Sequence, residues 1–189
     1  MMAAPARRQT LPAGDPDAEH RRHLVSALVL DRPGTLNRVS GLLRARSFNI
    51  ESLTVGTTDE PGRSRMTIAL RGDDGHLRQV LAQLERVIDV LEVRDLTTVP
   101  HVELELALVE LDAPADSDAE AAIRAVLATA GGETIPTADG TWRARLTASP
   151  DAIDQALNAL RGHGLRRLVR AGAVAMTTPT PTENGAAPA

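Results

Sequence analysis

The chain contains no cysteine, no lysine and no tyrosine, and these absences exclude several classes of protein. Without cysteine it has no disulfide, thiolate metal site or cysteine nucleophile, which fits a reducing compartment, and we expect it in the cytoplasm. Phe48 and Trp142 are its only aromatic side chains of the Phe, Trp and Tyr types, so nucleic-acid bases have few platforms for stacking. A formal net charge of -4 gives no general attraction to phosphate backbones or anionic membranes. We therefore expect neither nucleic acid nor a membrane as partner.

Both ends of the chain have a composition that does not support a folded core. Residues 1–22 are rich in Ala, Pro, Gly and Arg and lack the apolar stretch that a secretion signal needs. Residues 178–189 consist of Thr, Pro, Ala and polar residues, which bury too little apolar surface to become ordered. We therefore predict disordered tails over residues 1–22 and 178–189.

The first half of the remaining sequence alternates between strand and helix patterns. Apolar periodicity and turn residues predict a strand at 23–30, a helix from Leu36 to Leu43, strands at 49–57 and 65–71, a helix at 77–87 and a strand at 88–96. This βαββαβ order is typical of the ferredoxin-like fold, in which two helices cover one face of a four-stranded antiparallel sheet. We expect the other face of the sheet to stay open.

The second half repeats the same order of patterns. Val102, Leu104, Leu106 and Leu108 alternate with Glu103, Glu105 and Ala107, as in a strand. Ser117 has capping-box spacing to Glu120, and Ser149 followed by Pro150 predicts the start of a second helix. The prediction is an α+β protein with two tandem ferredoxin-like domains, an N-terminal one at residues 23–98 and a C-terminal one at residues 99–177.

Charged residues in the second half allow two interpretations. The alternating Glu103 and Glu105, and the cluster of Arg166, Arg167 and Arg170, could form contact surfaces. Exposed charge is more often simply solvated, because water and nearby ions satisfy it at little cost. We interpret these residues as solvated.

No group of residues has the spacing of a catalytic or metal site. The glycines form neither a phosphate loop nor a dinucleotide fingerprint, and no serine lies in a nucleophile-elbow sequence. His20 and His23 have a His-x-x-His spacing but no third ligand nearby in the sequence. We predict no catalytic residue and no metal ligand in this chain.

The segment 31–36, between the first strand and the first helix, is the most informative part of the sequence. In one interpretation Pro33 and Gly34 form an ordinary turn, and Asp31 caps the helix by accepting a backbone N–H. Turn chemistry is common enough to explain these residue types, and the local sequence taken alone favours this interpretation.

The same segment also fits a binding site for a small zwitterion. Backbone N–H groups of Gly34, Thr35 and Leu36 at the helix start could receive a carboxylate, assisted by the helix dipole. Asp31 and the side-chain oxygen of Asn49 could accept hydrogen bonds from an ammonium group. A free amino acid carries both groups.

Three motifs resemble the family of acetolactate synthase (acetohydroxyacid synthase) small subunits. They lie at residues 31–39, 48–56 and 64–68, and the pair Asn-Ile-Glu-Ser-Leu and Ser-Arg-Met-Thr is the most specific feature. The similarity extends from about residue 23 to residue 177. It implies an N-terminal ACT domain that forms a homodimer and binds a branched-chain amino acid, typically valine, between two such domains.

The resemblance also implies a partner and a role. The partner would be the large catalytic subunit, which in this family carries thiamine diphosphate, Mg²⁺ and FAD and makes acetolactate for valine, leucine and isoleucine biosynthesis. The small subunit would activate it and confer feedback inhibition. The ligand-contacting candidates carried over are Asp31, Gly34, Thr35 and Leu36, with Asn49 and Ile50 from the partner chain. The alternative is a free-standing ACT-type amino-acid sensor or scaffold that acts on another biosynthetic enzyme.

Overall fold

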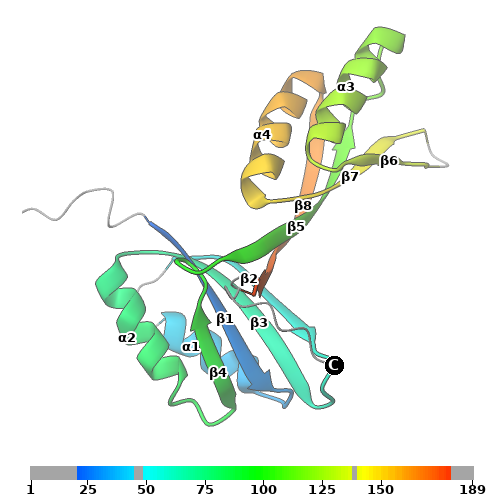
Figure 1. The fold of residues 1–189 in the computed structure, drawn as a ribbon. Helices are drawn as coiled ribbons and strands as arrows, with labels where there is room; N and C mark the ends of the chain where they lie inside the picture. The colour runs from blue at the N-terminus through cyan, green and yellow to red at the C-terminus, as the bar shows by residue number, and fades with distance from the viewer. Residues whose placement is uncertain (1–20, 45–48, 138–139, 180–189) are drawn as a thin grey trace, which may run out of the picture.

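The described residues form two four-stranded antiparallel sheets, each with two helices on one face (Figure 1). The structure is a computed structural model and describes residues 21–44, 49–137 and 140–179. Nearly all of both predicted tails lies outside these residues, and the first strand begins at Arg22. The predicted α+β fold with two βαββαβ repeats is confirmed.

The first half of the molecule is the unit of the first sheet. Its elements are β1 (Arg22–Leu30), α1 (Thr35–Arg44), β2 (Asn49–Thr57), β3 (Arg63–Arg71), α2 (Asp74–Leu84) and β4 (Val90–Asp95). The strand order is β2-β3-β1-β4, which leaves β2 at one edge. Its core lies between the sheet and the two helices, and includes the fully buried Val25, Ile68 and Leu84.

The second half follows the same plan, and its first and last strands, β5 and β8, are longer than β1 and β4. Its elements are β5 (His101–Leu111), α3 (Ser117–Thr129), β6 (Glu133–Ile135), β7 (Trp142–Ala148), α4 (Pro150–Leu160), a short 3₁₀ turn (Arg161–His163) and β8 (Leu165–Thr177), in the sheet order β6-β7-β5-β8. Ser149 caps α4 as predicted. The cap of α3 is Asp116 and not Ser117, because the Asp116 carboxylate accepts from the Ala119 N–H at 2.8 Å while Ser117 is already helical.

Side chains along β5 alternate as predicted. However, Glu105, which we interpreted as solvated, lies on the buried face, and the leucines on either side of it lie on the exposed face. Glu105 points inward and is 6% exposed, and it continues the buried face of Ala107 and Val109. The alternate residues on β5 pair with apolar residues of β8 on the outer face. We call this surface the apolar strip; it consists of Val102, Leu104, Leu106, Leu108, Val169, Val174 and Met176, all more than 40% exposed.

The open face of the first sheet is covered in part by the second half, which contradicts our prediction. Strand β8 extends beyond its own sheet and contacts β2 and β3 (Figure 1). Ala175 of β8 packs against Leu24, Ala69 and Leu96, a small cluster on the sheet face opposite the helices. The two halves are therefore joined by packing as well as by the chain connection. No helix in the described ranges is long and apolar enough to cross a membrane.

Candidate functional site

The predicted ligand-binding loop, residues 31–36, is held between two neighbouring turns. The Leu30 N–H donates to the Asp89 carbonyl at 2.8 Å, and the Asp31 N–H donates to the Gly62 carbonyl at 2.9 Å. Gly34 has a φ of +90°, a left-handed conformation that side chains with a Cβ adopt at a cost. The sequence Pro33-Gly34 therefore builds a sharp, anchored turn into α1.

This turn leaves backbone donors free at the start of α1. The Thr35 N–H donates to the Arg32 carbonyl at 3.2 Å and the Arg38 N–H donates to the Gly34 carbonyl at 3.0 Å. Within the described part of the chain, the N–H groups of Gly34, Leu36 and Asn37 have no hydrogen-bond acceptor. Free N–H groups at a helix start attract anions. Two of the three predicted donors, Gly34 and Leu36, are thus available, and Thr35 is engaged within the turn.

The side chains of the loop differ in what they offer. Thr35 lies on the core face of α1 with Val39 and Leu43, and its buried hydroxyl has no hydrogen-bond partner among the described residues. Asp31 is exposed, and its carboxylate makes no hydrogen bond or ion pair among the residues that the structure describes. The interpretation of Asp31 as a helix cap is therefore wrong. The carboxylate is free to meet a ligand.

An ion pair that sequence reasoning missed braces the turn. The Arg38 guanidinium pairs with Asp89, which is 4% exposed and follows α2. A Cβ added to Gly34 would lie 3.2 Å from Arg38 Nη1, so the guanidinium lies against the turn. Arg38 and Asp89 are 51 residues apart, so no local pattern could reveal the pair.

The other two predicted ligand residues lie near the opposite end of α1. Asn49 is the first residue of the edge strand β2, where its backbone pairs with Arg71. Ile50 lines a hollow of about 380 Å³ together with Asn37, Ser40, Gly41 and Arg44 of α1. Asn49 pairs with Arg71, which pairs with Arg22 at the start of β1, whereas the loop follows Leu30 at the end of β1. One chain therefore does not bring Asn49 and the loop together into one small site.

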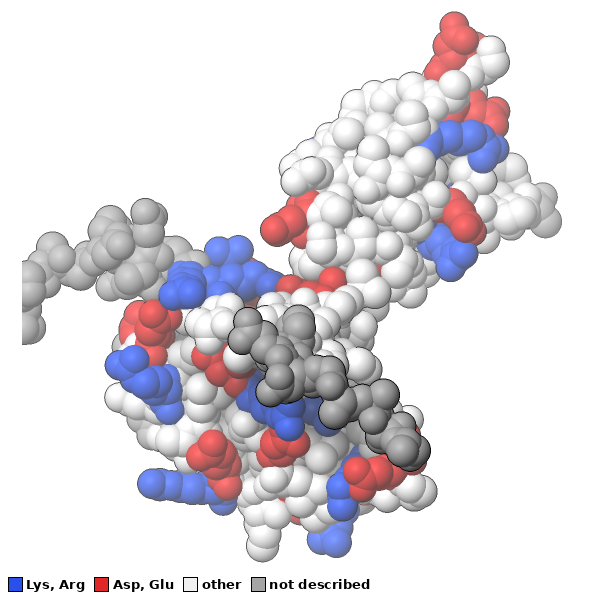
Figure 2. All heavy atoms as spheres, in the orientation of Figure 1, with Lys and Arg blue, Asp and Glu red and all other residues white. Residues whose placement is uncertain are grey.

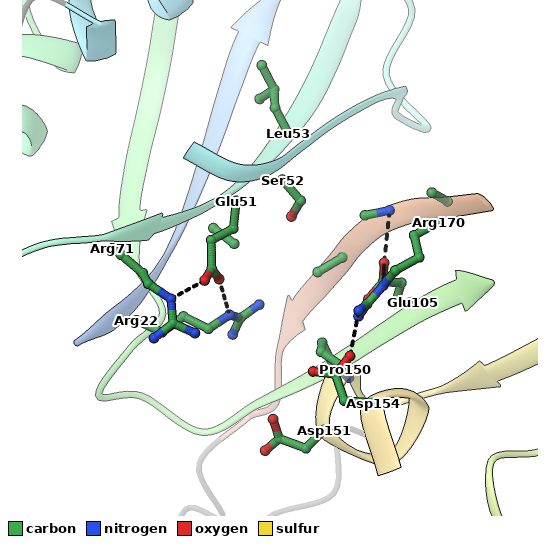
Figure 3. A pocket seen from close by; sticks show the side chains of 14 residues that line it. Arg22, Glu51, Ser52, Leu53, Arg71, Glu105, Pro150, Asp151, Asp154 and Arg170 are labelled. Atoms are coloured by element: carbon green, nitrogen blue, oxygen red, sulfur yellow. Dashed lines mark hydrogen bonds and ion pairs between the residues drawn. The ribbon is translucent and has the colours of Figure 1, made fainter. Parts of the chain in front are cut away.

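A second cavity lies between the two halves (Figure 3). It has a volume of about 610 Å³ and is lined by charged side chains from both sheets and from α4. Figure 2 shows acidic and arginine side chains side by side where the halves meet. Arg170 binds Glu105 through two nitrogens, Nε at 2.8 Å and Nη2 at 2.5 Å, and binds Asp154 at 2.5 Å.

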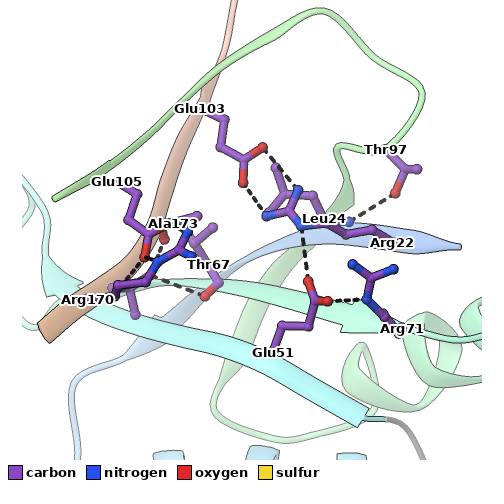
Figure 4. Close-up of polar contacts among 12 residues, drawn as sticks. Arg22, Leu24, Glu51, Thr67, Arg71, Thr97, Glu103, Glu105, Arg170 and Ala173 are labelled. Carbon is purple, nitrogen blue, oxygen red and sulfur yellow. Dashed lines mark hydrogen bonds and ion pairs between the residues drawn. The ribbon is translucent and has the colours of Figure 1, made fainter. Parts of the chain in front are cut away.

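A second arginine, Arg22, joins the two halves through ion pairs. Arg22 binds Glu103 of the second half at 2.5 Å and Glu51 of the first half at 3.2 Å (Figure 4). The hydrogen bond with Glu103 raises the pKa of Arg22, and the one with Glu105 raises the pKa of Arg170, in both cases against desolvation. Our interpretation of Glu103, Glu105 and Arg170 as merely solvated is therefore wrong.

Comparisons with known proteins identify the class that this fold and loop define. Residues 25–92 match the model of the AHAS small subunit-like ACT domain, and residues 104–179 match the model of the small subunit of acetolactate synthase. The first match covers the candidate loop and β2, and the second covers nearly all of β5 to β8. The molecule is therefore an ACT-domain protein.

Sequence relatives and a solved structure narrow the class. The probable acetolactate synthase small subunit of Methanothermobacter thermautotrophicus is 39% identical over 161 residues, which cover 85% of this chain and 95% of the relative. The acetolactate synthase small subunit of Aquifex aeolicus is 38% identical, over 82% of this chain and 81% of the relative. The crystal structure of the Thermotoga maritima small subunit superposes with a TM-score of 0.74 at 30% identity, covering 85% of this chain and 99% of that one. This chain belongs to the family of acetolactate synthase small subunits.

Proposed function

We propose that this chain regulates the catalytic subunit of acetolactate synthase by binding valine, or a close branched-chain amino acid, between the ACT domains of two copies. Family membership supports the regulatory role and a catalytic partner. The observation that carries the site is the set of N–H groups without an acceptor at the start of α1, together with the position of Asn49, which begins β2 just after the other end of α1.

A two-fold dimer resolves the separation of the two half-sites. If α1 and the edge strand β2 of one copy lie antiparallel to those of a second copy, the loop of each chain meets Asn49 and Ile50 of the other. The surface of α1 favours this approach, because Ser40 is small and a Cβ added at Gly41 would have no atom of the described residues within 4 Å. Nothing among the described residues requires glycine at position 41, so this face of α1 has room for a second copy to approach closely.

The chemistry of the two half-sites matches an amino acid with an apolar side chain. The N–H groups of Gly34 and Leu36 receive the carboxylate, and the unpaired Asp31 carboxylate faces the ammonium with help from Asn49. Leu36, which is 46% exposed, and Ile50 supply apolar walls for an isopropyl group. The negative charge of Asp31 strengthens the attraction for the ammonium.

Regulation then requires that valine bind two states of the holoenzyme with different affinity. The catalytic subunit supplies thiamine diphosphate, Mg²⁺ and FAD, and this chain supplies the sensor. In this proposal the small subunit raises the activity of the catalytic subunit, valine lowers it, and both act in the cytoplasm on branched-chain amino acid synthesis.

The test measures valine binding and oligomeric state together. Calorimetry of valine binding and analytical ultracentrifugation are performed on the wild type, on Asn49→Ala, on Gly41→Arg and on the control Asn158→Ala, an exposed residue of α4. We expect Asn49→Ala to weaken binding about tenfold or more, since it removes a hydrogen bond to a charged group. Gly41→Arg should abolish both dimer and binding, although position 41 lies outside the loop, and Asn158→Ala should change neither.

Two results would contradict the proposal. Unchanged heats for Asn49→Ala would remove that residue from the site. If the wild type does not alter acetolactate formation by its own organism's catalytic subunit, the regulatory assignment falls and a free-standing ACT-type sensor or scaffold takes its place.

A further inference from the structure

Strand β2 carries the second half-site and also contacts the second half of the molecule through β8. Its first residues, Asn49 and Ile50, are the ligand candidates. The next residue, Glu51, accepts from Arg22 and from Arg71. The ladder between β2 and β3 shifts register between Ile50 and Ser52, so Glu51 is the extra residue of a β-bulge. A bulge re-aims a side chain and is a place where a strand can adjust.

One guanidinium links this bulge to the second half. Arg22 Nε donates to Glu51 at 3.2 Å, and Arg22 Nη1 and Nη2 donate to the two oxygens of Glu103 at 3.1 and 2.5 Å (Figure 4). Glu51 and Glu103 belong to different sheets. We call this arrangement the Glu51–Arg22–Glu103 clamp. Bidentate pairs of this kind fix orientation as well as distance.

A second contact keeps β2 and β8 in fixed register. The Thr54 hydroxyl donates to the Ala173 carbonyl of β8. Gly172 has a φ of +84°, and a Cβ at this position would lie only 3.0 Å from the Ser52 Cβ. The two strands therefore approach as closely as a glycine permits, and a shift of β2 must move β8 or break these contacts.

We propose that the Glu51–Arg22–Glu103 clamp transmits occupancy of the ligand site to the second half of the molecule. The inference rests on the proposed function, since it assigns a route to the regulation by valine. A ligand held by Asn49 and Ile50 acts on the two residues just before the bulge. The bulge sets the position of the Glu51 carboxylate, and Arg22 carries that position to Glu103 on β5.

The test uses the holoenzyme, reconstituted from the full chain and its catalytic subunit. Glu103→Gln removes the charge at the far end of the clamp with little change in shape. Glu110→Gln is the matched control, because Glu110 lies on the same strand, is similarly covered and binds Arg143 at 3.1 Å inside the second half. Arg22→Gln cuts the same link from the other side. Thermal unfolding confirms that each variant is folded.

We expect all variants of the isolated small subunit to bind valine within about threefold of the wild type. The valine concentration for half-inhibition of the holoenzyme should rise about tenfold or more for Glu103→Gln and Arg22→Gln, the range in which allosteric couplings fall. Glu110→Gln should be inhibited like the wild type.

The outcomes separate this inference from the proposed function. If the wild type binds valine and Glu103→Gln is inhibited normally, the clamp is overturned and the proposed function stands. If Glu103→Gln or Arg22→Gln loses valine binding itself, the residue supports the site and does not transmit, which also overturns the clamp. The clamp is also overturned if only one of these two variants loses inhibition by valine. A wild type that binds no valine overturns both proposals.

Discussion

Helices α1 and α3 occupy the same place in the two βαββαβ halves, yet their first turns are completed differently. At α3 the carboxylate of Asp116 accepts from the Ala119 N–H, so the chain supplies its own anion. At α1 the N–H groups of Gly34 and Leu36 have no acceptor among the described residues. The same fold thus closes one helix start with a side chain and leaves the other for a ligand.

The two sheets also differ in how much of their surface the chain itself covers. The first sheet is packed on its helix face and receives β8 on the other, whereas the second sheet exposes the apolar strip. The second half contacts the first half mainly through the long strand β8, which packs against β2 and β3.

The largest expected effect tests whether the hydrophobic cores of the two halves unfold independently. Leu160 and Leu43 are both fully buried, one in each core. Leu160→Ala should lower the free energy of unfolding by about 2–5 kcal/mol, through lost transfer energy and a cavity. Trp142, the only tryptophan, packs against the second core and reports its unfolding by fluorescence. Leu43→Ala should change the free energy of unfolding obtained from Trp142 fluorescence by less than about 1 kcal/mol. Equal changes for the two variants would mean that both cores unfold as one cooperative unit.

The next effect concerns the close approach of β8 to β2. Gly172→Ala should cost about 1–3 kcal/mol in urea denaturation, because a side chain strains the positive φ and meets Ser52. Gly62→Ala is the matched control, with a φ of +79° and no atom of the part of the chain that the structure describes within 4 Å of the added Cβ. It should show the strain alone. Equal losses at the two positions would show that the approach of β8 to β2 does not limit residue size.

The smallest effect compares the two helix starts directly. Asp116→Ala should lower stability by about 1 kcal/mol, since it leaves the Ala119 N–H without its cap. Asp31→Asn should change the free energy of unfolding by less than about 0.5 kcal/mol, because its carboxylate has no partner within the described residues. The same substitution should weaken valine binding in calorimetry. If Asp31→Asn lowers stability but leaves valine binding unchanged, Asp31 completes the helix start within the chain and does not serve a ligand.

Most of the fold was predictable because it rests on local periodicity. The helix pattern through Val39 and Leu43 and the alternation at Met66 and Ile68 arise from each element's contact with its own core. The start of α3 was misplaced by one residue because Asp116 and Ser117 are both good caps, and only the geometry distinguishes them.

The contacts between the halves were not predictable for a physical reason. Glu103 and Glu105 alternate with leucines, and the usual rule turns the leucines inward. Here an arginine faces each glutamate, from positions far away in the sequence, so the glutamates turn inward instead. The candidate site was predicted in part: the turn at Gly34 is local and was found, while the Arg38 to Asp89 brace depends on tertiary structure.

The apolar strip has a consequence for the behaviour of the chain in solution. Seven large side chains along two neighbouring strands meet water at an unfavourable free energy. Salts such as sulfate strengthen the tendency to bury such surface. The chain made alone is therefore expected to salt out at low sulfate concentration, with the outer face of β5 and β8 as the surface that drives precipitation. Replacing Leu106 by a charged residue should raise its solubility limit without touching either core.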